Sequence, residues 1–322
     1  MSSSFTLDPK TIKKFQKEIL HWYKKNKRDL PWRRTRDPYH ILISEVMLQQ
    51  TQVNRVIPKY EKWLQVLPTI QDLAKAKVSD VLRLWSGLGY NRRALNLKKT
   101  AEIIVKEYGS VFPQEEKELV NLPGIGKYTA RALMCFAFDK QVAVVDTNIR
   151  KVILTKFFTS HPEPFSHPEQ GEGSQGRLRE GSQRDSSASP QNDKRIGEKE
   201  IQKVADKLLP KGKAYDWNHA LMDYATAKLR QEKIPIPKQS IPSSPDKIGV
   251  QSGSKFLGSH RYYRGQVLKV LLQKKKSKVS ELGILIKKDY SLQESGWLKR
   301  LLAELVKEGF VEIRNKEVFL AT

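Results

Sequence analysis

Apolar residues recur at helical spacing along the first half of the chain. Asp8-Pro9 has the sequence of an N-cap followed by a first-turn proline, and Phe15 and Ile19 fall on one apolar stripe. Short polar turns separate several such segments, so the pattern predicts a helical domain from residue 8 to about residue 160. Helical spacing resumes over residues 199–230, and we expect this stretch to pack back on the first.

Two segments lack this pattern. Residues 161–198 are dominated by Ser, Gly, Pro, Gln, Glu and Arg, and bulky apolar side chains nearly vanish there. Such a composition cannot bury enough surface to offset the entropy of ordering, so we predict a disordered insertion that interrupts the helical domain. Residues 231–260 are rich in Pro, Ser and Lys, which predicts an extended linker.

The tail, residues 261–322, predicts a small separate domain. Helices are expected over residues 263–273, 279–287 and 294–307, and two short strands around a polar turn follow from residue 310. Three helices followed by a hairpin is the order of a winged helix. Winged helices bind DNA and also serve as protein contacts, and the pattern favours neither use.

Charge indicates the class of partner. Lys and Arg number 59 against 35 Asp and Glu, which gives a net charge of +24. A balance this basic points first to nucleic acid and second to an anionic membrane surface. No apolar run approaches the roughly 18 residues that a membrane span needs, and the start Met1-Ser-Ser-Ser is not secretory. We therefore expect no membrane association and a cytoplasmic protein, associated with the nucleoid in a bacterium or located in a nucleus or organelle in a eukaryote.

Cysteine usage limits the chemistry. The chain has one cysteine, Cys135, which excludes a disulfide framework, a four-cysteine zinc site and a cysteine-ligated iron–sulfur cluster. We expect no metal and no cofactor.

The segment Leu122-Pro-Gly-Ile-Gly-Lys-Tyr-Thr is a Gly-x-Gly turn that opens a helix. Gly124 and Gly126 let the backbone approach a ligand closely, and the free N–H groups at the helix start can bind a phosphate. A plain turn or a nucleotide-binding loop would share this pattern. The helix before the turn, over residues 115–121, and the lack of a preceding strand favour a helix-hairpin-helix contact with a DNA backbone.

Two carboxylates are candidates for chemistry. Glu45 lies among Ile41, Leu42 and Val46, and a carboxyl in apolar surroundings either pairs with a cation or has a raised pKa. Asp146 ends an apolar run and opens a predicted helix, so an ordinary N-cap would explain it as well.

Four motifs, taken together and in this order, resemble those of the MutY-type adenine DNA glycosylases of the helix-hairpin-helix superfamily. They are Ser44-Glu-Val-Met-Leu-Gln-Gln-Thr-Gln, Leu84-Trp-Ser-Gly-Leu-Gly-Tyr-Asn-Arg-Arg, Leu122-Pro-Gly-Ile-Gly and Val145-Asp-Thr-Asn. The resemblance covers about residues 10–158 and 199–230. It implies a mainly α, two-lobed glycosylase fold, here followed by a small winged-helix (α+β) domain.

The resemblance also implies the activity and its residues. The protein is expected to be a monomer that excises adenine mispaired with 8-oxoguanine or guanine from double-stranded DNA. Glu45 would protonate adenine at N7 and later manage the water, and Asp146 would stabilise the sugar cation. Asn148 would orient these groups, and Tyr128 would hydrogen-bond near Glu45. Bifunctional relatives carry a lysine where Tyr128 stands, so a monofunctional enzyme is implied, with the adjacent Lys127 facing elsewhere.

Further residues match the family's DNA contacts. Tyr90 and Gln50 match wedges that enter the duplex while the target base is flipped out. The expected base pocket consists of Arg28, Leu30, Trp32, Arg33 and His219. The expected DNA-binding residues are Gln50, Tyr90, Arg92, Gly124, Gly126, Lys127 and Thr129.

The chain also departs from the family pattern. The family's four cluster-binding cysteines are missing, Asn91 replaces a common second aromatic, and His219 stands where Gln or Glu is usual. The winged-helix tail replaces the Nudix-like domain that senses 8-oxoguanine, and we expect it to add affinity more than chemistry. Two alternatives remain open. A thymine or uracil mismatch glycosylase would share Tyr128 but would not keep Glu45 in its motif, and a non-catalytic DNA-binding regulator would have no need of both carboxylates.

Overall fold

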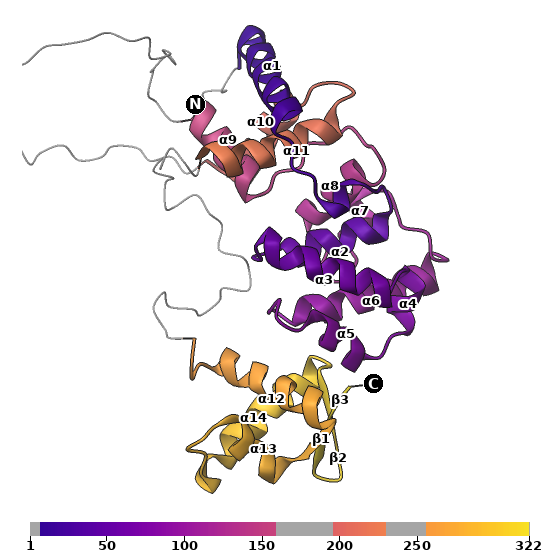
Figure 1. Ribbon diagram of the computed structural model, residues 1–322, viewed down its shortest axis with the longest axis vertical. Coiled ribbons are helices and arrows are strands. Elements are labelled where there is room, and N and C mark those ends of the chain that lie inside the picture. Colours follow the sequence, from indigo (N-terminus) through magenta and orange to yellow (C-terminus); the bar gives the residue numbers. More distant parts are fainter. Residues whose placement is uncertain (1–6, 159–195, 230–255, 322) are drawn as a thin grey trace, which may run out of the picture.

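A computed structural model describes residues 7–158, 196–229 and 256–321 of the chain. The predicted insertion and the predicted linker lie almost entirely outside the described residues. Figure 1 shows three groups of elements in succession along the long axis of the molecule. We call them the discontinuous lobe, the continuous lobe and the C-terminal domain.

The continuous lobe is an all-helical bundle formed by one stretch of chain. Its core is built around Trp63 and Trp85, both fully buried, whose ring centroids lie 5.7 Å apart in an edge-to-face arrangement. The Trp63 Nε1–H donates to the Tyr39 hydroxyl (2.9 Å), which donates to the backbone oxygen of Leu67 (2.8 Å), so no polar atom of this aromatic group is left unpaired. The elements are η1 (Pro31–Arg33), α2 (Pro38–Leu48), α3 (Val53–Val66), α4 (Ile70–Lys75), α5 (Val78–Trp85), α6 (Arg92–Glu107), α7 (Glu116–Leu119) and α8 (Lys127–Phe136).

The discontinuous lobe joins the start of the chain to segments much later in the sequence. Asp8 caps its first helix by accepting a hydrogen bond from the backbone N–H of Thr11 (3.0 Å), as the sequence predicts. The ring of Phe15 contacts Phe157 and Trp217 edge to face, with centroids 5.1 and 5.7 Å apart. The elements are α1 (Pro9–Asn26), α9 (Thr147–Phe157), α10 (Glu198–Leu208), α11 (Ala214–Tyr224) and the π-helix η2 (Ala225–Leu229). Apolar residues of α10 and α11 form one buried cluster with those of α1 and α9.

The C-terminal domain contains the predicted three helices and hairpin, together with a third strand that the pattern did not predict. That strand, β1, is a Lys-Ser-Lys sequence in which only Ser277 is buried, so it carries too few apolar residues to be recognised. The sheet is antiparallel in the order β1-β3-β2, with Ser277 and Ile313 both opposite Val318. The elements are α12 (His260–Lys274), β1 (Lys276–Lys278), α13 (Val279–Ile286), η4 (Leu292–Glu294), α14 (Ser295–Lys307), β2 (Val311–Arg314) and β3 (Glu317–Leu320).

The prediction of a mainly α, two-lobed fold with a small α+β domain after it is confirmed (Figure 1). Among the described residues, no helix is long and apolar enough to cross a membrane.

Candidate active site

Glu45 lies inside the continuous lobe on α2, with 6% of its surface exposed. The Tyr128 hydroxyl at the start of α8 donates a hydrogen bond of 2.7 Å to its Oε2. Burial raises the pKa of Glu45 to about 7, although the Tyr128 hydrogen bond works in the opposite direction. Burial also raises the pKa of Tyr128 well above its usual range, and the charge of Glu45 adds to the effect. Glu45 is therefore a carboxyl that can hold a proton near neutral pH.

Asp146 begins α9 in the other lobe. Its Oδ1 accepts the backbone N–H of Ile149 (2.6 Å), and its Oδ2 accepts the Nδ2–H of Asn148 (2.9 Å). Burial raises its pKa against these two hydrogen bonds, and its charge in turn contributes to the raised pKa of Glu45. The structure thus brings the two predicted carboxylates together from different lobes, each in its own polar surroundings.

Asn218, which the sequence analysis missed, anchors the irregular segment that leads to Asp146. From α11 its Oδ1 accepts the backbone N–H of Val144 (2.9 Å), and its Nδ2 donates to the backbone oxygens of Val142 (3.1 Å) and Ala214 (2.8 Å). The side chain is buried, and these hydrogen bonds satisfy its amide oxygen and nitrogen. In the sequence Asn218 stands in Asn-His-Ala-Leu, and nothing in these neighbours indicates its hydrogen-bond partners.

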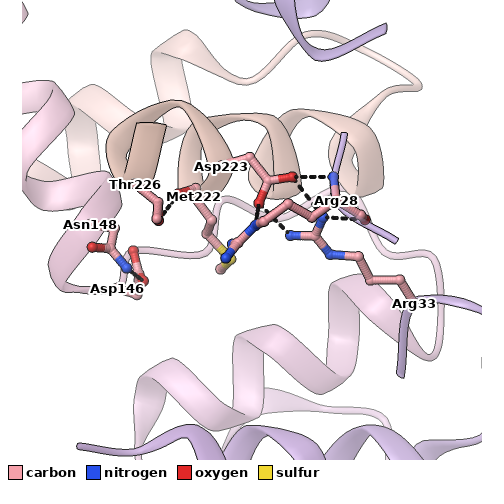
Figure 2. Close-up of polar contacts among 7 residues, drawn as sticks. All are labelled: Arg28, Arg33, Asp146, Asn148, Met222, Asp223 and Thr226. Carbon is pink, nitrogen blue, oxygen red and sulfur yellow. Dashed lines mark hydrogen bonds and ion pairs between the residues drawn. The ribbon is translucent and has the colours of Figure 1, made fainter. Parts of the chain in front are cut away.

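A second missed residue, Asp223 near the end of α11, holds two of the predicted pocket residues (Figure 2). Its Oδ1 accepts the Nε–H of Arg28 (2.6 Å) and an Nη2–H of Arg33 (2.9 Å), and its Oδ2 accepts an Nη1–H of Arg33 (2.7 Å). Burial alone would raise the pKa of Asp223, but the two guanidinium groups outweigh it and lower the pKa. Asp223 thereby fixes Arg33 near Glu45. The positive charge of Arg33 lowers the pKa of Glu45.

The other predicted pocket residues are mostly interior. Leu30 and Trp32 are buried around η1, and the Trp32 ring meets Tyr60 edge to face at 5.5 Å. His219 is stacked flat on Phe136, with ring centroids 4.2 Å apart, and its Nδ1 is buried without a hydrogen-bond partner. Burial lowers the pKa of His219 well below its usual range, so the imidazole is neutral. The structure therefore places His219 in the interior, against the rings of Phe136 and Tyr215.

The helix-hairpin-helix turn joins α7 to α8. Gly124 has a φ of +78°, and a Cβ there would lie 2.8 Å from the side chain of Asn96, so the turn requires glycine. Gly126 is the N-cap of α8, and Gly124, Gly126 and Lys127 are exposed. The side chain of Thr129, which the sequence analysis also expects to bind DNA, is buried in the third position of α8.

The two predicted wedges are neighbouring loop tips of the continuous lobe. Gln50 follows α2 and Tyr90 precedes α6, and both have a left-handed backbone, with φ of +55° and +48°. Tyr90 is 42% exposed. Arg92 is exposed and lies 4.0 Å from Glu308 of the C-terminal domain, measured from Nη1 to Oε2.

The residues present do not fit the cysteine-ligated cluster that the family pattern implies. Cys135 is buried and accepts a hydrogen bond from the Nδ2 of Asn218 at 3.3 Å, and burial raises the pKa of its thiol to about 12. Within the described ranges, no group of three or more His, Cys, Asp or Glu side chains is arranged to hold a metal ion.

Comparisons with known proteins show what the chain is similar to. Residues 43–166 match the family described as HhH-GPD superfamily base excision DNA repair protein. An adenine DNA glycosylase of Mycolicibacterium smegmatis is 50% identical over 137 residues, which is 42% of this chain and 47% of that protein. The adenine DNA glycosylase of Mycobacterium tuberculosis is 47% identical over 42% of this chain and 45% of its own length. The chain thus spans less than half the length of these curated relatives.

A solved structure extends the likeness over more of the chain. The structure of a thermostable thymine-DNA glycosylase is 32% identical, covers 68% of this chain and 87% of its own, and has a TM-score of 0.54. A complex of endonuclease III with DNA, 19% identical with a TM-score of 0.51, shares the fold. From the extent and identity of these matches, the chain belongs to the HhH-GPD superfamily of base excision DNA repair proteins.

Proposed function

We propose that the protein is a monofunctional adenine DNA glycosylase that excises adenine mispaired with 8-oxoguanine or guanine. The observation that carries the proposal is the buried Glu45, which is hydrogen-bonded to Tyr128, has a pKa of about 7 and lies near Asp146. Identities of 47–50% with adenine DNA glycosylases over the segment that contains these residues support the same activity.

The reaction breaks the bond between adenine N9 and C1′ of deoxyribose. Adenine leaves poorly as an anion, so a proton must reach the ring as the bond breaks. Protonated Glu45 supplies it to N7, and the electron pair of the breaking bond stays on the purine. The sugar is left as an oxocarbenium ion, which water attacks at C1′ to give free adenine and an abasic site after a proton is lost to Glu45.

Asp146 has the complementary task of keeping a negative charge beside the developing sugar cation. Two features favour its ionised form over that of Glu45. It lies at the N-terminus of α9, where the helix dipole stabilises an anion, and it accepts hydrogen bonds from Ile149 and Asn148. The first proton taken up by the pair therefore goes to Glu45. The reaction requires this arrangement, with Glu45 as the acid and Asp146 as the anion.

Strand cleavage is not part of the proposal. It would need an amine within reach of C1′, and the residue beside Glu45 is Tyr128, which forms no imine. Lys127 is exposed at the helix start, whereas the hydroxyl of Tyr128 points to Glu45.

DNA is held by several parts of the molecule in this proposal. The turn at Gly124 and Gly126 binds backbone phosphate through its N–H groups, with Lys127 adding charge. Gln50 and Tyr90 enter the duplex where the adenine leaves it. Arg28 and Arg33, fixed by Asp223, border the space that receives the base.

A second candidate is a thymine mismatch glycosylase, which the 32% identity with a thymine-DNA glycosylase over 87% of that chain favours. Thymine offers no ring nitrogen corresponding to N7, so it would leave Glu45 without its proposed task. The two candidates therefore differ in whether base release requires Glu45.

The test is base release from duplexes that contain adenine opposite 8-oxoguanine, adenine opposite guanine, or thymine opposite guanine, with abasic sites revealed by alkali. Adenine release that Glu45→Gln and Asp146→Asn each lower by about 10²–10⁴-fold is expected. Glu107→Gln, which changes an exposed carboxylate of α6, is the matched control. Thymine release unaffected by Glu45→Gln would support the second candidate instead. A borohydride-trapped covalent adduct would contradict the monofunctional assignment.

A further inference from the structure

Arg93, at the start of α6, makes an unusual number of contacts for a single side chain. Its guanidinium is largely enclosed, and burial lowers its pKa to about 10. Among the described residues it forms no ion pair with a carboxylate. Instead its Nη1 and Nη2 donate to oxygen atoms of two separate segments of the chain.

One set of these oxygens belongs to the end of α2 and the loop that follows it. Nη1 lies 2.6 Å from the backbone oxygen of Val46, 3.2 Å from that of Met47 and 2.7 Å from that of Gln49. Carbonyls in the last turn of a helix lack intrahelical partners and carry partial negative charge, so a buried cation is an effective partner for them. Nη2 also lies 3.4 Å from the Thr51 hydroxyl, on the far side of Gln50.

The other set belongs to the loop that carries Tyr90. Nη2 lies 3.2 Å from the backbone oxygens of both Leu88 and Gly89, and the guanidinium carbon lies 5.6 Å from the centre of the Tyr90 ring. The indole N–H of Trp85 donates to the same Gly89 oxygen at 2.9 Å. A single planar group thus joins the loop of Gln50 to the loop of Tyr90.

Both loop tips need such support. Gln50 and Tyr90 are non-glycine residues with positive φ, a conformation that is unfavourable for an L-residue and persists only where its surroundings fix it. The Arg93 fork contacts the backbone oxygen of Gln49 and the hydroxyl of Thr51 on either side of Gln50, and the backbone oxygen of Gly89 directly before Tyr90. It also meets Val46, the residue after Glu45, so the same group links both tips to the helix of the candidate acid.

We infer that Arg93 is a positioning residue that couples the Gln50 and Tyr90 loops into one rigid unit, so that both enter the duplex together when the target base is extruded. The inference rests on the proposed function for the role of the two tips. Arg93 itself stays beneath the loops and takes no part in breaking the glycosidic bond. Its loss should therefore impair extrusion of a paired base and spare release of a base that is already unpaired.

The experiment compares two substrates in single-turnover adenine release. One is a duplex with adenine opposite 8-oxoguanine, and the other carries the same adenine opposite an abasic-site analogue, which leaves it without a partner. Arg93→Met, which keeps an apolar stem without donors, should lower release from the first by roughly 10- to 100-fold, the scale of a misplaced positioning group. Release from the second should stay within about twofold of the parent. Lys99→Met removes an exposed charge from the same helix and is expected to change neither rate.

Arg93→Lys tests whether the fork or the charge matters. A lysine keeps the charge, but its compact ammonium cannot span both sets of carbonyl oxygens, so we expect it to lose release from the paired substrate as Arg93→Met does. Parent-like release by Arg93→Lys would overturn the coupling. Equal loss on both substrates in a folded variant would also overturn it, because Arg93 would then act on the site of bond cleavage. If Arg93→Met does not fold, Arg93→Lys carries the same comparison.

Hydrogen exchange separates this inference from the proposed function, because it requires no substrate. In Arg93→Lys, backbone amides of residues 49–52 and 87–91 should both exchange faster than in the parent, and in Lys99→Met neither should. Faster exchange in only one of the two segments would show that the loops are not coupled. A parent that releases no adenine from either duplex would refute the proposed function and leave the exchange result to decide the coupling.

Discussion

The guanidinium carbon of Arg261, in the first turn of α12, lies 3.9 Å from the centre of the Tyr90 ring. A residue of the C-terminal domain therefore covers a side chain that we propose enters the duplex. Insertion of Tyr90 between bases would break this contact. The contact therefore stabilises the DNA-free protein relative to its complex with DNA.

Arg261→Ala should consequently favour engagement of a mispair. An exposed cation–π contact contributes about 0.5–1 kcal/mol, which corresponds to roughly a two- to fivefold change. We expect the ratio of affinities for mispaired over fully paired duplex to rise by that factor, measured by fluorescence anisotropy. Taking the ratio cancels phosphate contacts that both duplexes share. Lys299→Ala, an exposed cation on α14, should leave the ratio unchanged, and a fall in the ratio for Arg261→Ala would mean that Arg261 acts with Tyr90 on the DNA.

The rate of adenine release should fall as pH rises through about 7. The acid role needs protonated Glu45, and with a pKa of about 7 the protonated fraction decreases tenfold for each pH unit well above that value. Single-turnover release between pH 5.5 and 9 measures this, with DNA binding followed over the same range. A rate that increases with pH would show that the ionised form of Glu45 is the active one.

Ionisation of Glu45 should also lower the free energy of unfolding at high pH. Its pKa is about 7 in the folded protein against 4.5 for a free side chain, so between these values the folded state holds a proton that the unfolded state releases. The free energy of unfolding therefore falls as the pH rises from about 4.5 to 7, by up to about 3 kcal/mol from this group. Denaturant unfolding should find Glu45→Gln more stable than the parent at pH 8 and similar to it at pH 4.5. The prediction fails if the advantage is the same at both pH values.

Asp223→Asn should destabilise the fold strongly. It leaves Arg28 and the buried Arg33 without their counter-charge, and breaking a buried ion pair on one side costs about 3–5 kcal/mol. Thermal and denaturant unfolding measure the loss. Asp29→Asn, which breaks the exposed pair with Arg34, is the control and should produce no measurable change. Similar effects of the two substitutions would mean that the Asp223 cluster stabilises the fold no more than a surface pair.

The sequence predicted those parts of the site whose residues carry local signals. Glu45 was a candidate from its apolar neighbours, and the structure brings it together with Tyr128. Asp146, which an ordinary N-cap would also explain, was singled out only by the family motif. Asp223 could not be recognised in this way, because its partners Arg28 and Arg33 lie 195 and 190 positions away in the sequence. Local pattern contains no information about contacts between such distant positions.

The same limit explains the other omissions. Asn218 and Arg93 act on backbone oxygens and N–H groups, which every residue possesses, so no side-chain pattern marks their partners. The strand β1 is only three residues long and has one buried side chain. His219 was placed near the base by its position in the family motif, and only the packing of Phe136 against its ring shows that it is interior.

The divided construction of the discontinuous lobe has a consequence for synthesis of the protein. Phe15 and Ile19 of α1 bury their apolar surface partly against Trp217 and other residues of α11, about 200 residues later in the chain. At a translation rate of about 5–20 residues per second, α11 is synthesised roughly 10–40 s after α1, and the apolar face of α1 lacks this contact until then. The lobe that contains Glu45 and Tyr128 is complete well before then, whereas the segment that leads to Asp146 gains its hydrogen bonds to Asn218 only when residue 218 has emerged. Glu45 and Asp146, which we propose act together, can therefore reach their final relative positions only after residue 218 has been synthesised.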